Sequence, residues 1–419
     1  MLHESGSDRL SRDAAPAAGA PEASPPNRHG GKPAKSPGGK PVGPPGRTQT
    51  ALPGGKPVRS HSRTQTALHG RRQTKLPGRR PGRYPARAVA GSSVVVLLMG
   101  LAALALGRYN VPFWDVLQTL ASRLLPIPAS VSGVEQNVVL LVRLPRVLLA
   151  LLVGGGLAIG GAALQAIFRN PLVSPEIIGV SAGASFGGAL ALLLGLGSAV
   201  LVGSSFLFGL AALGLLFLIT SGKGGTPMLM LVLGGVVTGS FFSALVALAT
   251  YVADPFTTLP AIVFWLLGSV ASATYAQVLV AVGPVLVGTA VLLALRWRIN
   301  VLSLGDEDAA ALGLRPRTLR WVVLVSVALI VAGAVAVSGA ISWVGLVIPH
   351  LARMWVGPDH RVLLPVSFLV GGAYIVAVDT IARTATAGEI PLGVLTALIG
   401  APVFFLLLRR NRDRIWDSA

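Results

Sequence analysis

Long apolar runs separated by short polar stretches fill the chain from residue 88 onward. Most are about 20 residues long, which is the length that an α-helix needs to cross the hydrocarbon core of a bilayer. A further apolar segment at 259–269 is too short to cross, and the eighth run is short as well. The pattern predicts an all-α polytopic membrane protein with about ten transmembrane helices. The expected spans are 88–107, 143–168, 174–195, 198–220, 227–251, 274–296, 318–338, 343–356, 361–384 and 390–409.

The composition agrees with this fold class. Hydrophobic residues make up 53% of the chain and charged residues only 12%, whereas soluble domains have about 25% charged residues. The 51 glycines suit helices that pack closely in lipid, where small side chains let backbones approach. With no cysteine in the chain, disulfides, thiolate metal sites and cysteine nucleophiles are excluded.

Residues 1–87 have a different character. They hold 17 Lys and Arg against 4 Asp and Glu, so +13 of the total net charge of +19 lies here. Large apolar residues are almost absent, so the segment cannot bury a core and is expected to be disordered. It contains a degenerate repeat, with "GGKPV" at 38–42 and again at 54–58. A polybasic segment touching anionic lipid or nucleic acid is one interpretation; a solvated cytoplasmic extension that fixes orientation is the one we favour.

The distribution of Lys and Arg predicts the orientation. If the basic tail is cytoplasmic, ten spans place both termini inside, with 411–419 as a short cytoplasmic C-terminus. The inner connections then hold thirteen Lys and Arg and the outer connections hold five, which agrees with the positive-inside rule. The polar stretch at 303–320 is therefore expected on the cytoplasmic side, between the sixth and seventh spans.

This stretch has the features of a short helix at 303–315. Asp306, Glu307 and Asp308 are adjacent, and acidic side chains favour the first turn of a helix because of its dipole. An alanine-rich turn follows, and then Gly313 and Pro316 end the pattern. From composition alone, an ordinary solvated loop is the alternative.

Four blocks of the apolar region stand out: "RLPRVLLALLVGGGLAIGGAALQAIFRNPLVSPEIIGVSAGA" (143–184), "FWLLGS" (264–269), "GAISWVGLVIPHLARMWVGPDHRVLLP" (339–365) and "DTIARTATAGEIPLGVLTALIGAPVFFLLL" (379–408). In this order they resemble the iron-siderophore/cobalamin (FecCD-type) permeases of ABC importers. The resemblance extends over essentially all of residues 88–410, and the tail has no counterpart in the family. It implies a cobalamin-permease-like homodimer that carries ABC ATPase subunits inside and a substrate-binding protein outside, with ATP-driven alternating access.

The same resemblance implies roles for three groups of residues. Coupling to the ATPase falls to the 303–315 segment, docking of the binding protein to outer arginines, and the gate to the turn after the fifth span. Snorkelling anchors are the alternative for the arginines, and Asp379 and Arg383 are spaced to pair along one helix. The expected residues are Gly305, Asp306, Glu307, Ala310, Leu312 and Gly313 for coupling; Arg143, Arg146 and Arg383 for docking; and Asp254, Pro255 and Phe256 for the gate.

No motif in the sequence indicates catalysis by this chain. It has no Walker A motif, metal-ligand cluster or nucleophile–base pair, so we expect no bound cofactor, with ATP held by the partner subunit. An ion-coupled secondary transporter is the main alternative of another class, but it would need ionisable residues within the membrane. A nearly uncharged path suits a bulky metal chelate crossing the bacterial cytoplasmic (inner) membrane. A ferric siderophore is the favoured cargo, with haem, cobalamin and molybdate-type oxyanions as alternatives.

Overall fold

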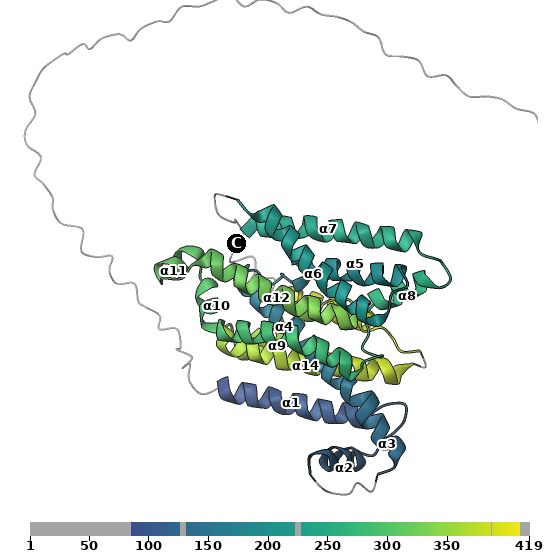
Figure 1. The fold of residues 1–419 in the computed structure, drawn as a ribbon. Coiled ribbons are helices and arrows are strands. Elements are labelled where there is room, and N and C mark those ends of the chain that lie inside the picture. Colours follow the sequence, from purple (N-terminus) through teal and green to yellow (C-terminus); the bar gives the residue numbers. More distant parts are fainter. Residues whose placement is uncertain (1–84, 126–130, 223–227, 387, 411–419) are drawn as a thin grey trace, which may run out of the picture. The chain divides into compact units, whose positions relative to one another are not determined.

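The computed structural model describes residues 85–125, 131–222, 228–386 and 388–410, where all regular elements are helices (Figure 1). The predictions for the basic tail and for residues 411–419 lie outside these ranges, except that the first helix begins at Pro85. The elements are α1 (Pro85–Ala105), α2 (Phe113–Leu124), α3 (Gly133–Asn137), η1 (Val138–Arg143), α4 (Leu144–Ile167), η2 (Pro175–Ile178), α5 (Val180–Leu193), α6 (Ser198–Thr220), α7 (Met228–Val252), α8 (Thr258–Leu266), α9 (Tyr275–Ala294), α10 (Arg296–Leu302), α11 (Asp306–Ala311), α12 (Pro316–Ser338), α13 (Val344–Val356), α14 (His360–Ala385) and α15 (Leu392–Arg410).

The helices correspond to the ten expected spans. Within the described ranges, seven helical segments are long and apolar enough to cross a membrane, and α5, α13 and α15 are shorter apolar helices. The segment predicted to be too short to cross is the nine-residue helix α8. The prediction of an all-α polytopic membrane protein is confirmed.

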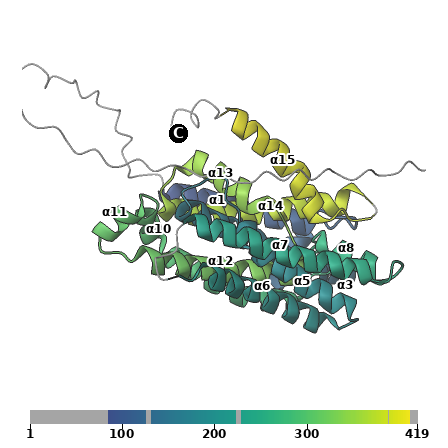
Figure 2. The same cartoon turned by 90° about the horizontal axis from the view of Figure 1, so that it is seen from above.

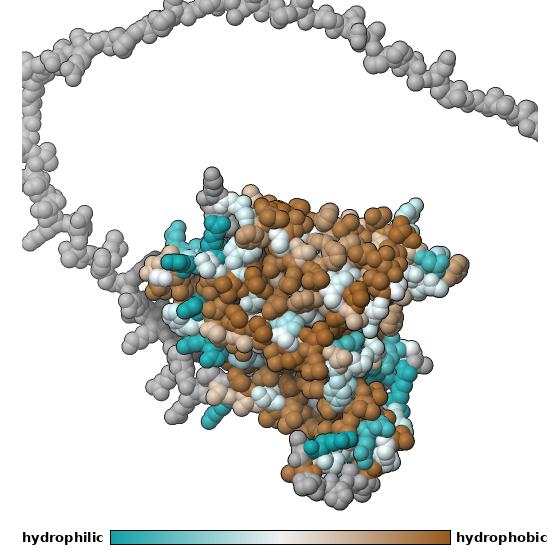
Figure 3. All heavy atoms as spheres, viewed as in Figure 1, coloured by the Kyte–Doolittle hydropathy of each residue, from teal (hydrophilic) through white to brown (hydrophobic). Residues whose placement is uncertain are grey.

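The long helices run side by side, with α10 and α11 at one end of the bundle and α8 and α3 at the other (Figure 1). Apolar side chains cover the middle of the bundle surface, and polar ones gather towards its two ends (Figure 3). Helix α15 crosses the direction of the other helices and lies at the side of the bundle (Figure 2). The apolar band is the surface that lipid would cover.

Helix α4 is the centre of the packing. The apolar window of the helical segment that contains it is 83% buried, against 22% for α6 and 28% for α7. Its glycines explain the close packing, because a Cβ at Gly154 would overlap the carbonyl oxygen of Gly371 in α14. A Cβ at Gly161 would overlap the carbonyl oxygen of Gly345 in α13. Gly154 and Gly161 are seven residues apart and so share one face of α4. Backbone therefore meets backbone at two levels along this face, as small residues allow in membrane bundles.

The helix that contains α4 starts ten residues earlier than predicted, since α3, η1 and α4 form one continuous segment from Gly133 to Ile167. The π-helical turn η1 lies directly before Pro145. Proline has no N–H group, and its ring clashes with the carbonyl four residues before it in a regular α-helix. A wider π turn relieves that clash and lets the helix continue. Arg143 and Arg146 consequently lie inside a helix rather than at its start.

We expect Gly161→Ala to destabilise the protein by about 1–3 kcal/mol, the usual cost of overpacking a core. Gly214→Ala is the matched control, since Gly214 is in a helix but its added Cβ would meet nothing within 4 Å. The control should be neutral or slightly stabilising, because alanine favours helix more than glycine does. Thermal unfolding in detergent measures both variants, and equal melting temperatures for the two would show that the α4–α13 contact is not tight.

Candidate functional site

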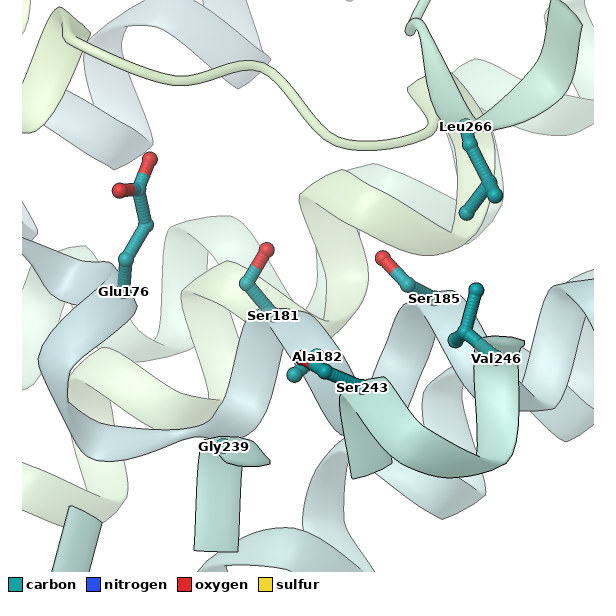
Figure 4. Close-up of a pocket in the computed structure, with 8 residues that line it drawn as sticks. All are labelled: Glu176, Ser181, Ala182, Ser185, Gly239, Ser243, Val246 and Leu266. Atoms are coloured by element: carbon teal, nitrogen blue, oxygen red, sulfur yellow. The ribbon is translucent and has the colours of Figure 1, made fainter. Parts of the chain in front are cut away.

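An open hollow of about 390 Å³ lies on the face formed by η2, α5, α7 and α8. Figure 4 shows the Glu176 carboxylate and the hydroxyls of Ser181 and Ser185 on the same side of the hollow. The lining is otherwise small or apolar, so the hollow offers hydrogen bonds and a single carboxylate. The lining residues are Glu176, Ser181, Ala182, Ser185, Gly239, Ser243, Val246 and Leu266.

The backbone at Gly179 brings Glu176 into this hollow. Gly179 has a φ of 77° and stands between η2 and α5, in a left-handed conformation that glycine adopts without strain. A Cβ at this position would press on the backbone of Gly239 and the side chain of Thr238 in α7. The chain therefore turns close against α7, and η2 carries its carboxylate over that helix.

A second hollow of about 450 Å³ continues the first along α7. It shares Glu176, Gly239 and Ser243 with the first and extends to Gly235. From Gly235 to Val246 the helix rises about 17 Å, roughly half of the thickness of a bilayer core. The two hollows together form a groove along α7 that is lined by serine hydroxyls, the Glu176 carboxylate and apolar side chains. Sequence reasoning missed it, although Glu176 lies within a predicted span, where an ionisable residue is itself a signal of function.

The predicted gate residues lie in the turn between α7 and α8. Asp254 accepts hydrogen bonds from the Thr257 hydroxyl (2.7 Å) and from the backbone N–H groups of Thr257 (2.8 Å) and Phe256 (3.1 Å). These bonds, the one from the Thr257 hydroxyl foremost, lower the pKa of Asp254. Asp254, Pro255 and Phe256 are exposed and do not line either hollow. Their role as a gate stays a prediction.

Two of the outer arginines hold the end of α1. Arg143 donates to the carbonyl oxygens of Leu104 (2.6 Å) and Ala105 (2.8 Å), and Arg383 donates to that of Ala103. The last carbonyls of a helix have no partner within the helix, and cations are favoured at this negative end of the dipole. The two guanidinium groups therefore complete the C-terminus of α1.

Arg146 joins three segments through carboxylates. Its guanidinium donates to Asp379 in α14 (2.7 Å) and to Glu389 in the loop before α15 (2.8 Å). Burial alone would raise the pKa of Glu389, but the hydrogen bond from Arg146 and the charges of the nearby arginines together outweigh burial, and the pKa is lowered. Arg383 lies 3.9 Å from Asp379 one helical turn away, so the predicted pairing of these two is confirmed.

The three arginines predicted to dock the binding protein are buried. Arg143, Arg146 and Arg383 have exposed fractions of only 4%, 6% and 5%. The physical reason is the π turn, which extends the second span outward and encloses the first two of these side chains among α1 and α14. The docking prediction needed free guanidinium groups, and the structure shows all three bonded within the chain. Docking itself is not tested by these contacts.

The predicted coupling segment, 303–315, forms one short helix, α11, at the opposite end of the bundle, and α10 ends just before this segment (Figure 1). Helix α11 ends in a Schellman motif: Gly313 has a φ of 78° and donates to the carbonyl of Ala310, and Leu314 donates to that of Ala309. Gly305 is buried directly before the helix, and Ala309 faces inward. Asp306 pairs with the buried Arg320 of α12 at 2.7 Å.

The outer face of α11 is free within the described chain. Glu307, Ala310 and Gly313 are exposed, and Leu312 is 60% exposed. An exposed leucine beside acidic side chains, on a helix with defined ends, suits contact with a partner protein. The structure therefore brings the predicted coupling residues together on one projecting element.

Several known permeases are similar to this chain in sequence. The molybdate import system permease of Haemophilus influenzae is 44% identical over 329 residues, covering 78% of this chain and 97% of the relative. The cobalamin import system permease of Halobacterium salinarum is 43% identical over 291 residues, covering 69% of this chain and 77% of the relative. A probable iron chelatin permease of Helicobacter pylori is 42% identical over 275 residues, covering 66% and 83%.

A solved structure supports the same assignment. It is an inward-facing conformation of a metal-chelate type ABC transporter, 43% identical, with a TM-score of 0.70 over 78% of this chain and 99% of that one. The FecCD transport family matches residues 95–410, which include the polar groove, the buried arginines and the projecting helices. The chain is an ABC transporter permease and belongs to the FecCD transport family.

Proposed function

We propose that this chain is the membrane permease subunit of a binding-protein-dependent importer that carries a metal chelate across the cytoplasmic membrane. The groove along α7 supports the proposal, because it offers a polar path through an apolar bundle. ATP is hydrolysed by the partner subunit, and this chain itself binds no cofactor. A ferric siderophore is the cargo that we favour, with haem and cobalamin as alternatives of the same kind.

A second copy of the chain closes the path. The groove is open on one side, where lipid would leave its polar groups without partners at a cost in free energy. Around it, α7 exposes large apolar side chains, among them Val237 and Phe241 at 56% and 52%. A second protomer facing this surface would cover the apolar side chains and complete the wall of the path. A homodimer follows from this requirement.

The ATPase subunits are placed at the inner side, against α11. Their closure on ATP would bind one arrangement of the two permease copies more tightly than the other. Such a difference in binding free energy is what shifts a conformational equilibrium. The path then opens alternately to the outer binding protein and to the cytoplasm, with both chain termini on the cytoplasmic side.

The charge of the groove bears on the cargo. Glu176 is ionisable and faces the open space, and an anion passing within 4 Å of its carboxylate would be opposed by about 4 kcal/mol at an effective dielectric constant of 20. A neutral or cationic chelate meets no such barrier. The relative named for molybdate keeps an oxyanion as the second candidate cargo.

An ion-coupled secondary transporter gains no support from the buried charges. Such a transporter would need ionisable groups along its path. Arg146 and Asp379 are buried in the membrane-spanning part, yet they bond to each other and lie on α4 and α14. The groove is lined by η2, α5, α7 and α8 instead, and Glu176 is the one ionisable residue among the described residues of its lining. A single carboxylate does not form the chain of ionisable groups that a proton relay uses.

The coupling role is tested by Gly313→Val. A β-branched side chain at a φ of 78° is strained by about 1–2 kcal/mol, so the end of α11 should distort and ATP hydrolysis should respond less to loaded binding protein. Gly195→Val is the matched control: Gly195 ends α5 with the same pair of hydrogen bonds and a φ of 65°, and neither glycine has a neighbour within 4 Å of its added Cβ. Equal stimulation of ATPase activity in the two variants, measured in reconstituted complexes, would remove α11 from the coupling interface.

The cargo class is tested with Glu176→Gln. The wild-type complex should respond to binding protein loaded with a ferric chelate and not to binding protein mixed with molybdate. Removing the charge should raise the import of an anionic chelate relative to a neutral one by about tenfold or more, because the repulsion is lost. Uptake of radioactive iron into vesicles gives the ratio, with Ser243→Ala as an uncharged change in the same groove. If molybdate stimulates the ATPase activity of the complex and no chelate does, the cargo is an oxyanion and not a metal chelate.

A further inference from the structure

Helix α10 is bonded to the turn between α13 and α14 through Asn300. Its side-chain nitrogen donates to the carboxylate of Asp359 at 2.6 Å. Its side-chain oxygen accepts from the backbone N–H of His360 at 2.8 Å and lies 2.7 Å from Nδ1 of the same residue. One amide side chain thus makes three contacts with two consecutive residues that lie about sixty positions away in the chain.

The identity of each atom in this contact follows from chemistry. A backbone N–H can only donate, so the Asn300 atom that faces His360 is the oxygen. Because that oxygen is an acceptor, Nδ1 of His360 carries the proton. Asn300 therefore presents its nitrogen to Asp359. Hydrogen bonds from Arg361, with a further one from Asn300, lower the pKa of Asp359 to about 2, so this acceptor is ionised at neutral pH.

The contact is enclosed and stiff. His360 is 5% exposed, and the Asp359 side chain also accepts from the backbone N–H of Arg361 at 3.0 Å, which caps the start of α14. Hydrogen bonds to a charged group are stronger than those between neutral groups. Moving α10 away from α14 would break such a bond and leave a carboxylate partly desolvated.

Helices α10 and α11 are bonded to the bundle at a second point, through α11. Asp306 at the start of α11 pairs with Arg320 of α12, so α11 is joined to α12 while α10 is joined to α14. Both α12 and α14 pack against α4. A displacement of α10 and α11 would therefore move α12 and α14, two of the helices that pack against the buried helix α4.

We propose that Asn300 is a positioning residue that couples α10 to α14. When the ATPase closes on α11, the contact of Asn300 makes α14, and the α4–α12 core packed on it, move together with α10 and α11. The inference rests on the proposed function and adds the element that carries the movement inward from α11. Helix α14 has 26 residues and is therefore about 39 Å long. Pro365 lies inside the helix but does not interrupt it, so a displacement at Asp359 would reach the far end near Thr384.

The test exchanges the side chains at positions 300 and 359. Asn300→Asp places a second carboxylate against Asp359 and should break the contact. Asn300→Asp combined with Asp359→Asn restores a donor opposite an acceptor, with the roles reversed, and should rescue it. Asp359→Asn alone still offers an oxygen to Asn300 and should behave as wild type. Arg361→Gln removes an exposed ion pair, which contributes little, and serves as the control in the same turn.

The readout is a distance at the outer end of α14. The chain has no cysteine, so a single Thr384→Cys substitution can carry a spin label, and the two copies of the dimer give one distance. The full-length permease is purified with its ATPase in lipid nanodiscs and measured with and without ATP and vanadate. We expect the distance to change with nucleotide in the wild type, and the shifted population to fall about tenfold in Asn300→Asp. ATP hydrolysis should continue in every variant.

Three outcomes would overturn the proposal: no nucleotide-dependent change in the wild type, an unchanged shift in Asn300→Asp, or no recovery in the exchanged pair. Should Asn300→Asp fail to insert, Asn300→Ala removes the same bonds without adding charge and is judged by the same criteria. Failure of the permease to retain any ATPase would instead contradict the proposed function, so the two failures are distinguishable.

Discussion

The approach of backbone to backbone around α4 is the constraint on which the rest of the structure depends. Lipid tails are as apolar as leucine, so helices in a bilayer are held by packing and polar contacts rather than by exclusion of water. Glycines at Gly154, Gly161 and Gly371 let α13 and α14 reach the backbone of α4. The peripheral helices α1, α6 and α7 are far less buried. A tight centre with a looser periphery leaves the groove beside α7 in the part of the molecule that can rearrange at least cost.

The outer charges follow from the same environment. In a low-dielectric interior an unpaired ion is costly, so buried charges are paired and hydrogen-bonded. Three arginines face only two carboxylates in this cluster, and the remaining positive charge meets the carbonyl end of α1. The excess of cations over carboxylates in this cluster is thus explained within the protomer. These contacts hold α1, α4 and α14 together at one end of the bundle. The opposite ends of the three helices lack these contacts and are therefore where we expect movement to begin.

Hydropathy was sufficient to predict the spans, because each crossing helix needs a length of apolar sequence that no soluble connection contains. The helix α11 was also predictable, since acids, alanines and Gly313 are local signals for its start, body and end. The π turn before Pro145 could not be predicted, because a proline at that place equally indicates a helix start. The contact of Asn300 with Asp359 and the hollow around Glu176 depend on packing between distant segments. No spacing of residues in the sequence predicts either feature.

The π turn at Val138–Arg143 has a consequence for the tolerance of this segment to insertion and deletion. A π turn is an α-helix with one additional residue accommodated in it. Deleting one residue there would restore regular α-helical winding and bring the Pro145 ring against the carbonyl oxygen four residues before it. Helix α3 would keep nearly its present facing, but the helix would kink or break beside Arg143, whose guanidinium group meets the carbonyls at the end of α1. In this segment, chain length is constrained as tightly as residue identity.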